Sequence, residues 1–292
     1  MAFENGVFTA PELNPSKSGL FSIIKPETYT ATANQERWVR GYAQEFYAEP
    51  TALRNIDDTD STIEDVYAAT TKPARFIDVK PFFIEVEDTD STFGLVGQDR
   101  FERVLKQLDA ATQKAVETEL WSGAVTQGET LGNPYLRDAS TVTTLDSGNA
   151  LSAERALALV EHKARSLSPL GEQPYIHMSA DVASILKTAL QFDKKENMIV
   201  TRLGSPVIIG AGYNGDGPVG ASGADASDIN KWIYASGHLA IHLGASEVVN
   251  DTLAQGYDVS GNQNDMRIKA FRSASVHFDT SIHLAARVDL TA

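Results

Sequence analysis

The stretch TRLGSPVIIGAGYNGDGPVG, residues Thr201–Gly220, decides how the rest of this chain is interpreted. Gly210, Gly212 and Gly215 follow an apolar run with the spacing G-x-G-x-x-G, which opens a dinucleotide-binding loop when a helix comes next. Here more glycine and a proline follow, which disfavour a helix, and the next apolar run, Lys231–Ala235, ends without an acid for a ribose. We therefore reject a cofactor site and predict a flexible loop that leaves a strand.

The composition excludes several classes of protein. The 292 residues suffice for one large domain or two ordinary ones, and 42% of them are hydrophobic, as in globular proteins. The absence of cysteine excludes disulfides, thiolate metal sites and cysteine nucleophiles. The net charge of −14 argues against tight wrapping of nucleic acid, which needs lysine and arginine to displace counterions. No apolar run approaches membrane-spanning length, and no secretory signal is recognisable.

The first third of the chain contains two extended segments. Residues 1–54 have few periodic apolar positions and several prolines, so we expect an arm that does not pack on its own chain. Between Glu64 and Asp88, two apolar runs alternate with polar residues, which predicts a long charged β-hairpin. The repeat DTDST at 58–62 and 88–92 is typical of helix caps and solvated turns, because the glycine and glutamate of a calcium loop are not at the required positions.

The remaining sequence mixes helices and strands, which predicts an α+β fold. Apolar residues at helical spacing over 97–123 predict a helix of about 24 residues, roughly 35 Å long, that ends at Gly123. Shorter helices are expected at 152–167 and 179–190. The last apolar run, Ile282–Leu290, alternates with His283 and other residues, which predicts a strand with one buried face. Further strands are expected at 175–178, 198–203, 206–209, 232–235 and 239–243.

No set of side chains has the spacing of a catalytic or metal site. His238 and His242 can share one face of a strand, but no carboxylate is spaced to complete a metal site, and no H-E-x-x-H helix exists. His277 and His283 lie on either side of Asp279, but no G-x-S-x-G turn supplies a nucleophile. We therefore expect surface or hydrogen-bonded histidines, no metal, and a protein that is not an enzyme.

Several segments resemble a known family. PYIHMSADVASIL (Pro174–Leu186), TRLGSPVIIGAGYNGDGP (Thr201–Pro218) and WIYASG (Trp232–Gly237) are similar to the C-terminal half of major capsid proteins of tailed bacteriophages, above all those infecting actinobacteria. The segment ETELWSGAV, Glu117–Val125, is similar to the end of the spine helix in that family. The order of elements agrees with the Hong Kong 97-type capsid fold over nearly the whole chain, most strongly from Thr92 onward.

The resemblance implies five parts with distinct places in a shell. They are an N-terminal arm at 1–54, an E-loop β-hairpin with its flanks at 55–92, the spine helix of the P-domain at 93–130, an axial A-domain at 131–244, and strands that return to the P-domain at 245–292. The arm would reach over a neighbouring subunit and the E-loop would lie across an adjacent one. Because the arm is far shorter than a scaffolding region of about a hundred residues, a separate scaffold protein, or none, is implied.

The resemblance also implies which residues contact other subunits. Tyr213, Asn214 and Asp216 would belong to an axial A-domain loop, where copies crowd a five-fold or six-fold axis. Contacts between neighbouring subunits, which some family members cross-link through a lysine and an asparagine, are implied for a basic and amide set: Lys72, Arg75, Lys80, Asn262 and Asn264.

The implied function is structural. Copies of the chain would self-assemble into pentamers and hexamers of an icosahedral head, the virion capsid, which encloses double-stranded DNA without sequence-specific binding and is assembled in the host bacterial cytoplasm. Separate scaffold, portal and decoration proteins are the other implied partners, and no membrane is. Three alternatives stay open: an encapsulin-like nanocompartment shell, a nucleotide-binding oxidoreductase that uses the Gly210–Gly215 loop, and a tail or adaptor protein that forms small rings.

Overall fold

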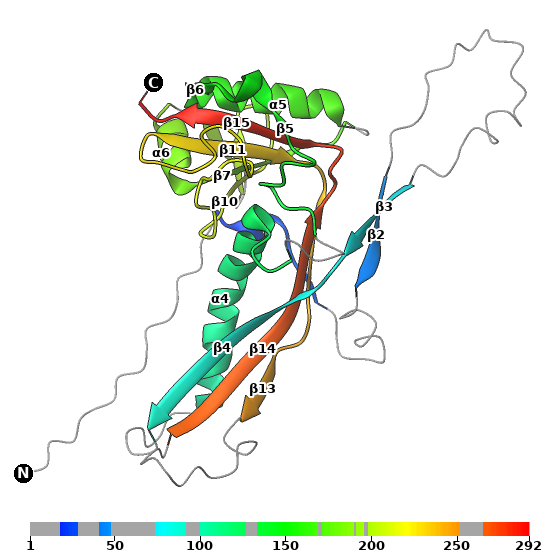
Figure 1. The fold of residues 1–292 in the computed structure, drawn as a ribbon, viewed down its shortest axis with the longest axis vertical. Coiled ribbons are helices and arrows are strands. Elements are labelled where there is room, and N and C mark those ends of the chain that lie inside the picture. Colours follow the sequence, from blue (N-terminus) through cyan, green and yellow to red (C-terminus); the bar gives the residue numbers. More distant parts are fainter. Residues whose placement is uncertain are drawn as a thin grey trace, which may run out of the picture.

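The computed structural model describes residues 18–28, 41–47, 74–91, 100–126, 133–168, 171–189, 191–195, 198–250 and 265–291. These residues form two units that are stacked along the long axis of the molecule (Figure 1). The lower unit combines one long helix with a sheet of long strands, and the upper unit is a second sheet with two helices packed on it. The expected mixture of helices and strands is therefore confirmed.

The lower sheet is built around β14, a strand of 14 residues. β4 pairs with β14 antiparallel along one edge, and β12 and β13 pair with it along the other, so that Ala274 lies opposite both Phe82 and Leu243. β1 extends β12 in parallel. The strands of this sheet are β1 Glu27–Thr28, β4 Phe82–Ser91, β12 Leu239–Leu243, β13 Glu247–Asn250 and β14 Asp265–Phe278.

The long helix α4, Arg100–Ser122, lies along this sheet (Figure 1). Its apolar stripe is fully buried at Val104, Leu108, Val116 and Leu120. Its 23 residues correspond to roughly 35 Å, which confirms the helix expected from the apolar spacing. The helix ends at Gly123, whose φ of 61° lies in the left-handed region and whose N–H donates to the Glu119 carbonyl at 2.7 Å.

The upper unit is a six-stranded sheet in the order β10-β7-β11-β15-β5, with β6 also paired to β15. Both expected shorter helices are confirmed, and they are α5 Ala153–Leu167 and α6 Ala180–Thr188. The strands are β5 Thr143–Thr144, β6 Ala150–Ser152, β7 Tyr175–Met178, β10 Val207–Ile209, β11 Asn230–Ser236 and β15 His283–Asp289. Three short elements accompany them: the 3-10 helix η1 Leu145–Gly148 and the paired strands β8 Phe192–Lys195 and β9 Met198–Thr201.

Two apolar cores meet at the upper sheet. One core lies between α4 and the lower sheet and continues upward to Trp232, Tyr234 and Ala285. The other lies between the upper sheet and the helices α5 and α6, and it includes Leu284 and Ala286. The expectation that the last strand buries only one face is therefore wrong. β15 is buried on both faces because it is a central strand between the two cores.

The expected hairpin between Glu64 and Asp88 is also wrong. β3, Ala74–Val79, pairs with β2, Tyr42–Tyr47, in a separate two-stranded ribbon, whereas β4 pairs with β14. The chain runs on from β3 to β4 without reversing (Figure 1). Only Lys80 and Pro81 lie between these strands, and the Asn133 side chain bonds both the N–H and the carbonyl of Lys80, at 2.7 and 2.8 Å, where a turn would use them.

The expectation of an unpacked arm over residues 1–54 is wrong for two segments. Residues 18–28 contain α1, Leu20–Ile23, and β1, and the Leu20 side chain is fully buried in the core of the lower unit. Residues 42–47 form β2. The remainder of the expected arm lies outside the described residues.

The expected domain boundary at residue 244 does not separate the two units, because one strand on each side of it belongs to the other unit. β12, which precedes it, belongs to the lower sheet, and β15, which follows it, belongs to the upper sheet. The chain therefore passes between the units three times: between α4 and β5, between β11 and β12, and between β14 and β15. A single boundary in the sequence cannot describe this arrangement. The expectation that residues 245–292 all return to one unit is wrong, because β13 and β14 lie in the lower sheet and β15 lies in the upper sheet.

Replacing Leu108 by alanine should lower the free energy of unfolding by about 2–5 kcal/mol, because it leaves a cavity in a fully buried position between α4 and the lower sheet. The neighbouring exposed substitution Gln107→Ala should change it by less than about 0.5 kcal/mol. Urea unfolding followed by circular dichroism measures both. Equal effects of the two substitutions would contradict the placement of the apolar stripe.

Candidate functional site

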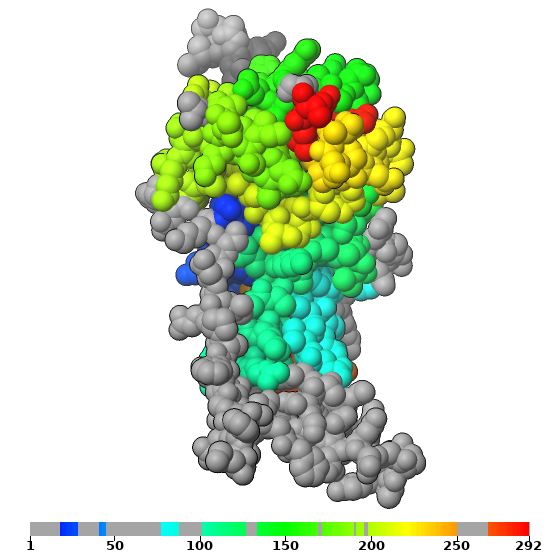
Figure 2. Space-filling model, turned by 90° about the vertical axis from the view of Figure 1, so that its left-hand side faces the viewer, coloured from blue at the N-terminus to red at the C-terminus, as the bar shows by residue number. Residues whose placement is uncertain are grey.

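The glycine stretch rests on the upper end of α4, as the space-filling view shows for the yellow loop above the green helix (Figure 2). No helix follows Gly215 anywhere in the described range 198–250. The Gly212 N–H, which a phosphate would need, donates to the Glu117 carboxylate of α4 at 3.0 Å. A side chain at Gly212 is excluded, because its Cβ would lie 2.6 Å from the Thr118 nitrogen. These contacts argue against the oxidoreductase alternative built on this loop.

Tyr213 is an internal residue and not part of an exposed loop. Its ring packs on Trp121 with 4.6 Å between ring centroids, and its hydroxyl bonds His177 Nδ1 at 3.0 Å. The second His177 nitrogen, Nε2, bonds Ser236 Oγ at 2.8 Å. Burial, followed by the charge of Glu117, raises the pKa of Tyr213 well above its ordinary value. The expectation of a flexible loop is therefore wrong at Tyr213.

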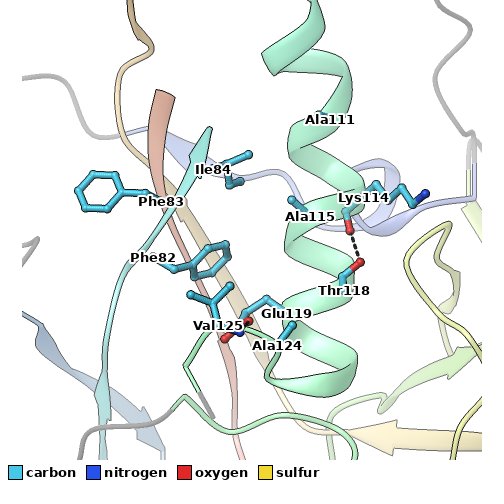
Figure 3. Close-up of a pocket in the computed structure, with 10 residues that line it drawn as sticks. All are labelled: Phe82, Phe83, Ile84, Ala111, Lys114, Ala115, Thr118, Glu119, Ala124 and Val125. Atoms are coloured by element: carbon cyan, nitrogen blue, oxygen red, sulfur yellow. Dashed lines mark hydrogen bonds between the residues drawn. The ribbon is translucent and has the colours of Figure 1, made fainter. Parts of the chain in front are cut away.

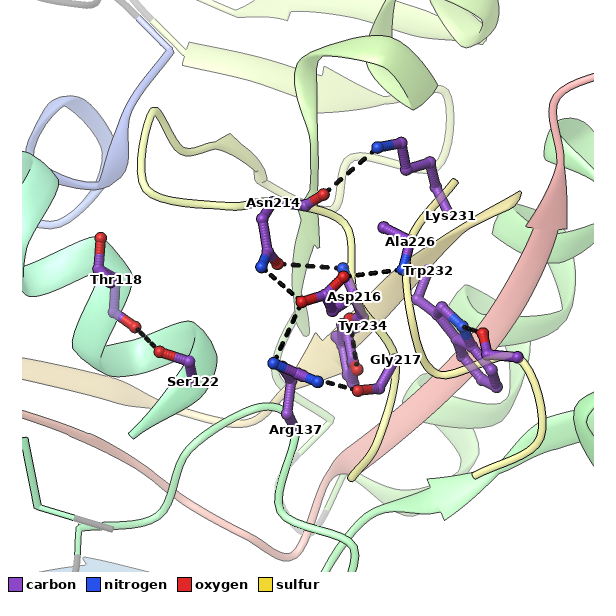
Figure 4. Close-up of polar contacts among 11 residues, drawn as sticks. Thr118, Ser122, Arg137, Asn214, Asp216, Gly217, Ala226, Lys231, Trp232 and Tyr234 are labelled. Carbon is purple, nitrogen blue, oxygen red and sulfur yellow. Dashed lines mark hydrogen bonds and ion pairs between the residues drawn. The ribbon is translucent and has the colours of Figure 1, made fainter. Parts of the chain in front are cut away.

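Asp216 holds the next part of the loop in place (Figure 4). Its carboxylate accepts the Ala226 N–H at 2.8 Å and the Asn214 side-chain amide at 2.5 Å, and it lies 3.2 Å from the Arg137 guanidinium. The Tyr234 hydroxyl donates to the Asp216 carbonyl at 3.0 Å. These bonds join the loop to β11 and to Arg137, so the Asp216 carboxylate is used in contacts within the subunit. The Asn214 residue beside it is exposed.

Two apolar side chains of the same loop are exposed, and sequence reasoning did not single them out. Val219 is 44% exposed and Ile229 is 52% exposed. Both lie among glycines and polar residues and belong to no helical or strand-like apolar pattern. An isolated apolar residue in such a segment is the sequence signal that could have identified them.

The expected contacts of the basic and amide set stay a prediction. Lys72, Asn262 and Asn264 lie outside the described residues. Arg75 is in β3, opposite Phe46 of β2. Lys80 is at the link between β3 and β4, held by Asn133. The residues that the structure describes therefore do not test this set.

An apolar groove opens between α4 and β4 (Figure 3). Its volume is about 350 Å³, and Phe83 and Val125 at its rim are 57% and 58% exposed. The Glu119 carboxylate fixes one end, since it accepts the N–H groups of Val125 and Thr126 at 2.8 and 3.1 Å. The lining residues are Phe82, Phe83, Ile84, Ala111, Lys114, Ala115, Thr118, Glu119, Ala124 and Val125.

Sequence reasoning missed this groove. The available signal was the pair Phe82–Phe83, because two consecutive aromatic residues in an alternating strand place one on each face. Phe82 is buried, and Phe83 contacts Phe271 of β14 edge-on while most of its ring remains exposed.

The histidines have structural roles. His277 and His283 lie in different sheets, opposite Ala240 and Ser236 respectively, so with Asp279 they form no triad. His242 stacks on His277 with 5.6 Å between ring centroids. Within the described ranges, no three acidic or histidine side chains are grouped so that they could hold a metal ion, and no helix there is long and apolar enough to cross a membrane.

Comparison with known proteins identifies the architecture. No protein-family model matches the chain, and no curated protein matches it in sequence. Solved structures do match. The capsid of an empty GTA particle, computed with C5 symmetry, has a TM-score of 0.58 at 10% identity, over 99% of this chain and 95% of that one. The chain has a capsid fold. The expected Hong Kong 97-like α+β fold is thereby confirmed, whereas the expected arm, E-loop, spine helix and A-domain stay predictions.

Two further matches show how widely this fold is shared. The Gordonia phage Cozz structure has a TM-score of 0.53 at 11% identity, over 98% of this chain and 91% of that one. The holo-SrpI encapsulin complex from Synechococcus elongatus has a TM-score of 0.55 at 9% identity, over 99% and 94%. The same architecture therefore occurs in phage and encapsulin structures.

Acidification should destabilise the subunit. Burial lowers the pKa of His177 and of His277 to about 3, and that of His283 to about 4, so the folded state keeps them neutral. The unfolded chain takes up these protons below about pH 6.5, and the free energy of unfolding should therefore fall as the pH drops from 6.5 to 5, by up to about 2 kcal/mol per histidine.

Urea unfolding at pH 7, 6 and 5 checks this expectation. His177→Gln removes one of the three groups and should reduce the slope of stability against pH by nearly one proton. His162 is exposed on α5, so His162→Gln is the matched control and should leave the slope unchanged. A slope that is the same in all three proteins would contradict the role of buried histidines.

Proposed function

We propose that this chain is a major capsid protein, which self-assembles into pentamers and hexamers of an icosahedral shell around double-stranded DNA. The observation that carries the proposal is the match of nearly the whole chain, and nearly the whole of each partner structure, to assembled capsids. The proposed role is structural and not enzymatic. The virion is the proposed location, with assembly in the host bacterial cytoplasm.

The parts of the fold suit this role. We assign α4 to the spine helix, the lower unit to the P-domain and the upper unit to the A-domain. The E-loop is assigned to the β2–β3 ribbon and the residues between its strands, in place of the hairpin expected from the sequence. The supporting observation is that the ribbon projects from the body as a separate two-stranded sheet, a structure that is marginal without a partner (Figure 1).

The groove between α4 and β4 is the proposed contact with a second copy of the chain. Its rim exposes Phe83 and Val125, and its wall is formed by apolar side chains of both elements. In an assembled shell each copy has neighbours on all sides, so an apolar hollow of this kind is covered without any other partner. Scaffold, portal and decoration proteins belong to the proposal as partners, and the DNA is enclosed without sequence-specific contacts.

An encapsulin-like shell is the second candidate, and the encapsulin match favours it as a specific alternative. Both candidates predict closed particles. They differ in the contents, which are double-stranded DNA in the capsid and a cargo protein in the nanocompartment. The acidic charge of −14 suits a wall that faces DNA without adhering to it.

Expression of the whole chain tests the shell. Closed particles tens of nanometres across are expected by negative-stain electron microscopy and light scattering, with the chain expressed alone or together with a separate scaffold protein. Nuclease-protected DNA in particles from infected cells would support the capsid, and a co-purified cargo protein would support the encapsulin. A persistent monomer under all these conditions would contradict both.

Val125→Glu should reduce the yield of closed particles at least about tenfold, because it places a charge on the rim of the groove without disturbing a buried side chain. Leu203→Glu is the matched control, since Leu203 is 62% exposed and lies far from the groove along the chain and in the fold. Both variants should unfold at the same urea concentration as the original protein. Equal loss of particles in both variants would contradict the specific role of the groove.

A further inference from the structure

Glu117 is a fully buried acid on α4 that binds two segments remote from it in sequence. Its Oε1 accepts the N–H of Leu20 at 2.9 Å, as well as the side-chain amide of Gln113 at 2.9 Å. Its Oε2 accepts the N–H of Gly212 at 3.0 Å. Leu20 lies 97 residues before Glu117 and Gly212 lies 95 residues after it. One carboxylate therefore satisfies backbone donors from the N-terminal segment and from the glycine loop.

The N-terminal segment, residues 18–28, also touches both units of the fold. The Ser18 carbonyl accepts the N–H of Ile209, the last residue of β10 in the upper sheet, at 2.9 Å. Ten residues later, β1 pairs with His242 and Leu243 of β12 in the lower sheet. The space-filling view shows blue atoms of this segment where the upper unit meets α4 (Figure 2). The segment is therefore a bridge between the two sheets at the position of Glu117.

Both bound segments pass close to α4, with Gly19 against side chains of the helix and Gly212 against its backbone. A Cβ on Gly19 would lie 1.7 Å from Gln113 Nε2 and 2.9 Å from Glu117 Oε1. The equivalent atom on Gly212 would lie 2.6 Å from the Thr118 nitrogen and 2.7 Å from the Lys114 carbonyl. Glycine at both positions lets each backbone reach the carboxylate directly. The Glu117 carboxylate thus binds the backbone of the N-terminal segment and the backbone of the glycine loop at the same turn of α4.

We propose that Glu117 is a positioning residue that couples the N-terminal segment to the glycine loop. Loss of the carboxylate would leave the buried N–H of Leu20 and the half-buried N–H of Gly212 without this acceptor, which destabilises both segments together. The coupling is reciprocal, so displacement of either segment weakens the seating of the other. In a shell subunit this contact would fix residues 18–28 between the two sheets, and this consequence alone rests on the proposed function.

Hydrogen–deuterium exchange of the whole protein tests the coupling. In Glu117→Ala, peptides covering residues 18–24 and 210–214 should both exchange at least about tenfold faster, while the central strand β15 stays protected. Glu117→Gln retains one carbonyl acceptor but turns an amide N–H toward the other donor, so it should give an intermediate effect. Gly19→Leu leaves the loop residues unchanged but places a side chain against Gln113 and Glu117, so by reciprocity it should also speed exchange at 210–214.

Glu119→Ala is the matched control. Glu119 is a second buried acid on the same helix, and it accepts the N–H groups of Val125 and Thr126. Its loss should speed exchange at 124–126 and leave residues 18–24 unchanged. Unchanged exchange at 18–24 in Glu117→Ala would overturn the proposal. So would equal release of that segment by Glu119→Ala, or uniform deprotection that includes β15 even in Glu117→Gln.

Particle formation separates this inference from the proposed function. If the original protein forms shells but the two segments exchange independently, the coupling is wrong and the shell function stands. If the segments are coupled but no shell forms under any condition, the shell function is wrong and the coupling stands. If the original protein forms shells, Glu117→Ala should lower the yield of particles more than Leu108→Ala does. Leu108→Ala is the comparison because it is a core variant whose loss of folding stability is expected to be of similar size.

Discussion

The packing of α4 along β14 is the interaction on which the rest of the structure depends. The helix is roughly 35 Å long and the strand roughly 48 Å, so the strand can cover the apolar stripe of the helix over its whole length. β4 and β12 then add to the two edges of β14, and the upper sheet closes the end of this core with Trp232 and Tyr234. The chain segments that pack against α4 at this end of the core carry backbone N–H groups that are partly or fully shielded from solvent. Glu117 and Glu119 supply the acceptors, which explains two buried acids on one helix.

The same requirement explains why a phosphate-binding sequence pattern is not a phosphate-binding site here. In a dinucleotide-binding loop, backbone N–H groups and the next helix point at the phosphates. In this chain Glu117 accepts the N–H of Gly212, Asp216 accepts that of Ala226, and the chain continues without a helix. The glycines serve close contact between loop and helix. Their spacing is shared with the cofactor loop because both tasks need backbone without Cβ atoms.

The features that the described part of the subunit leaves exposed are the ones that the proposed assembly would cover. The β2–β3 ribbon has only two strands, and the α4–β4 groove keeps Phe83 and Val125 in solvent. Each would be a liability on an isolated molecule. Capsid and encapsulin structures with this architecture are assembled particles, in which neighbouring copies are available to cover such surfaces. A small number of contacts, repeated by symmetry, then suffices to hold a shell together.

The sequence by itself determined the helices α4, α5 and α6, the strands β7, β10, β11 and β15 of the upper sheet, the lack of a helix after Gly215 and the capsid fold. Each of these follows from local periodicity, from glycine and proline, or from a short family pattern. Only the tertiary structure decided that β4 pairs with β14 and not with β3, that β15 is buried on both faces, that residues 18–28 pack on α4, and that Tyr213 is internal. Two alternating strands look the same whichever partner they take. Pairing depends on which distant face remains uncovered once α4 and β14 have packed, and no local pattern contains that information.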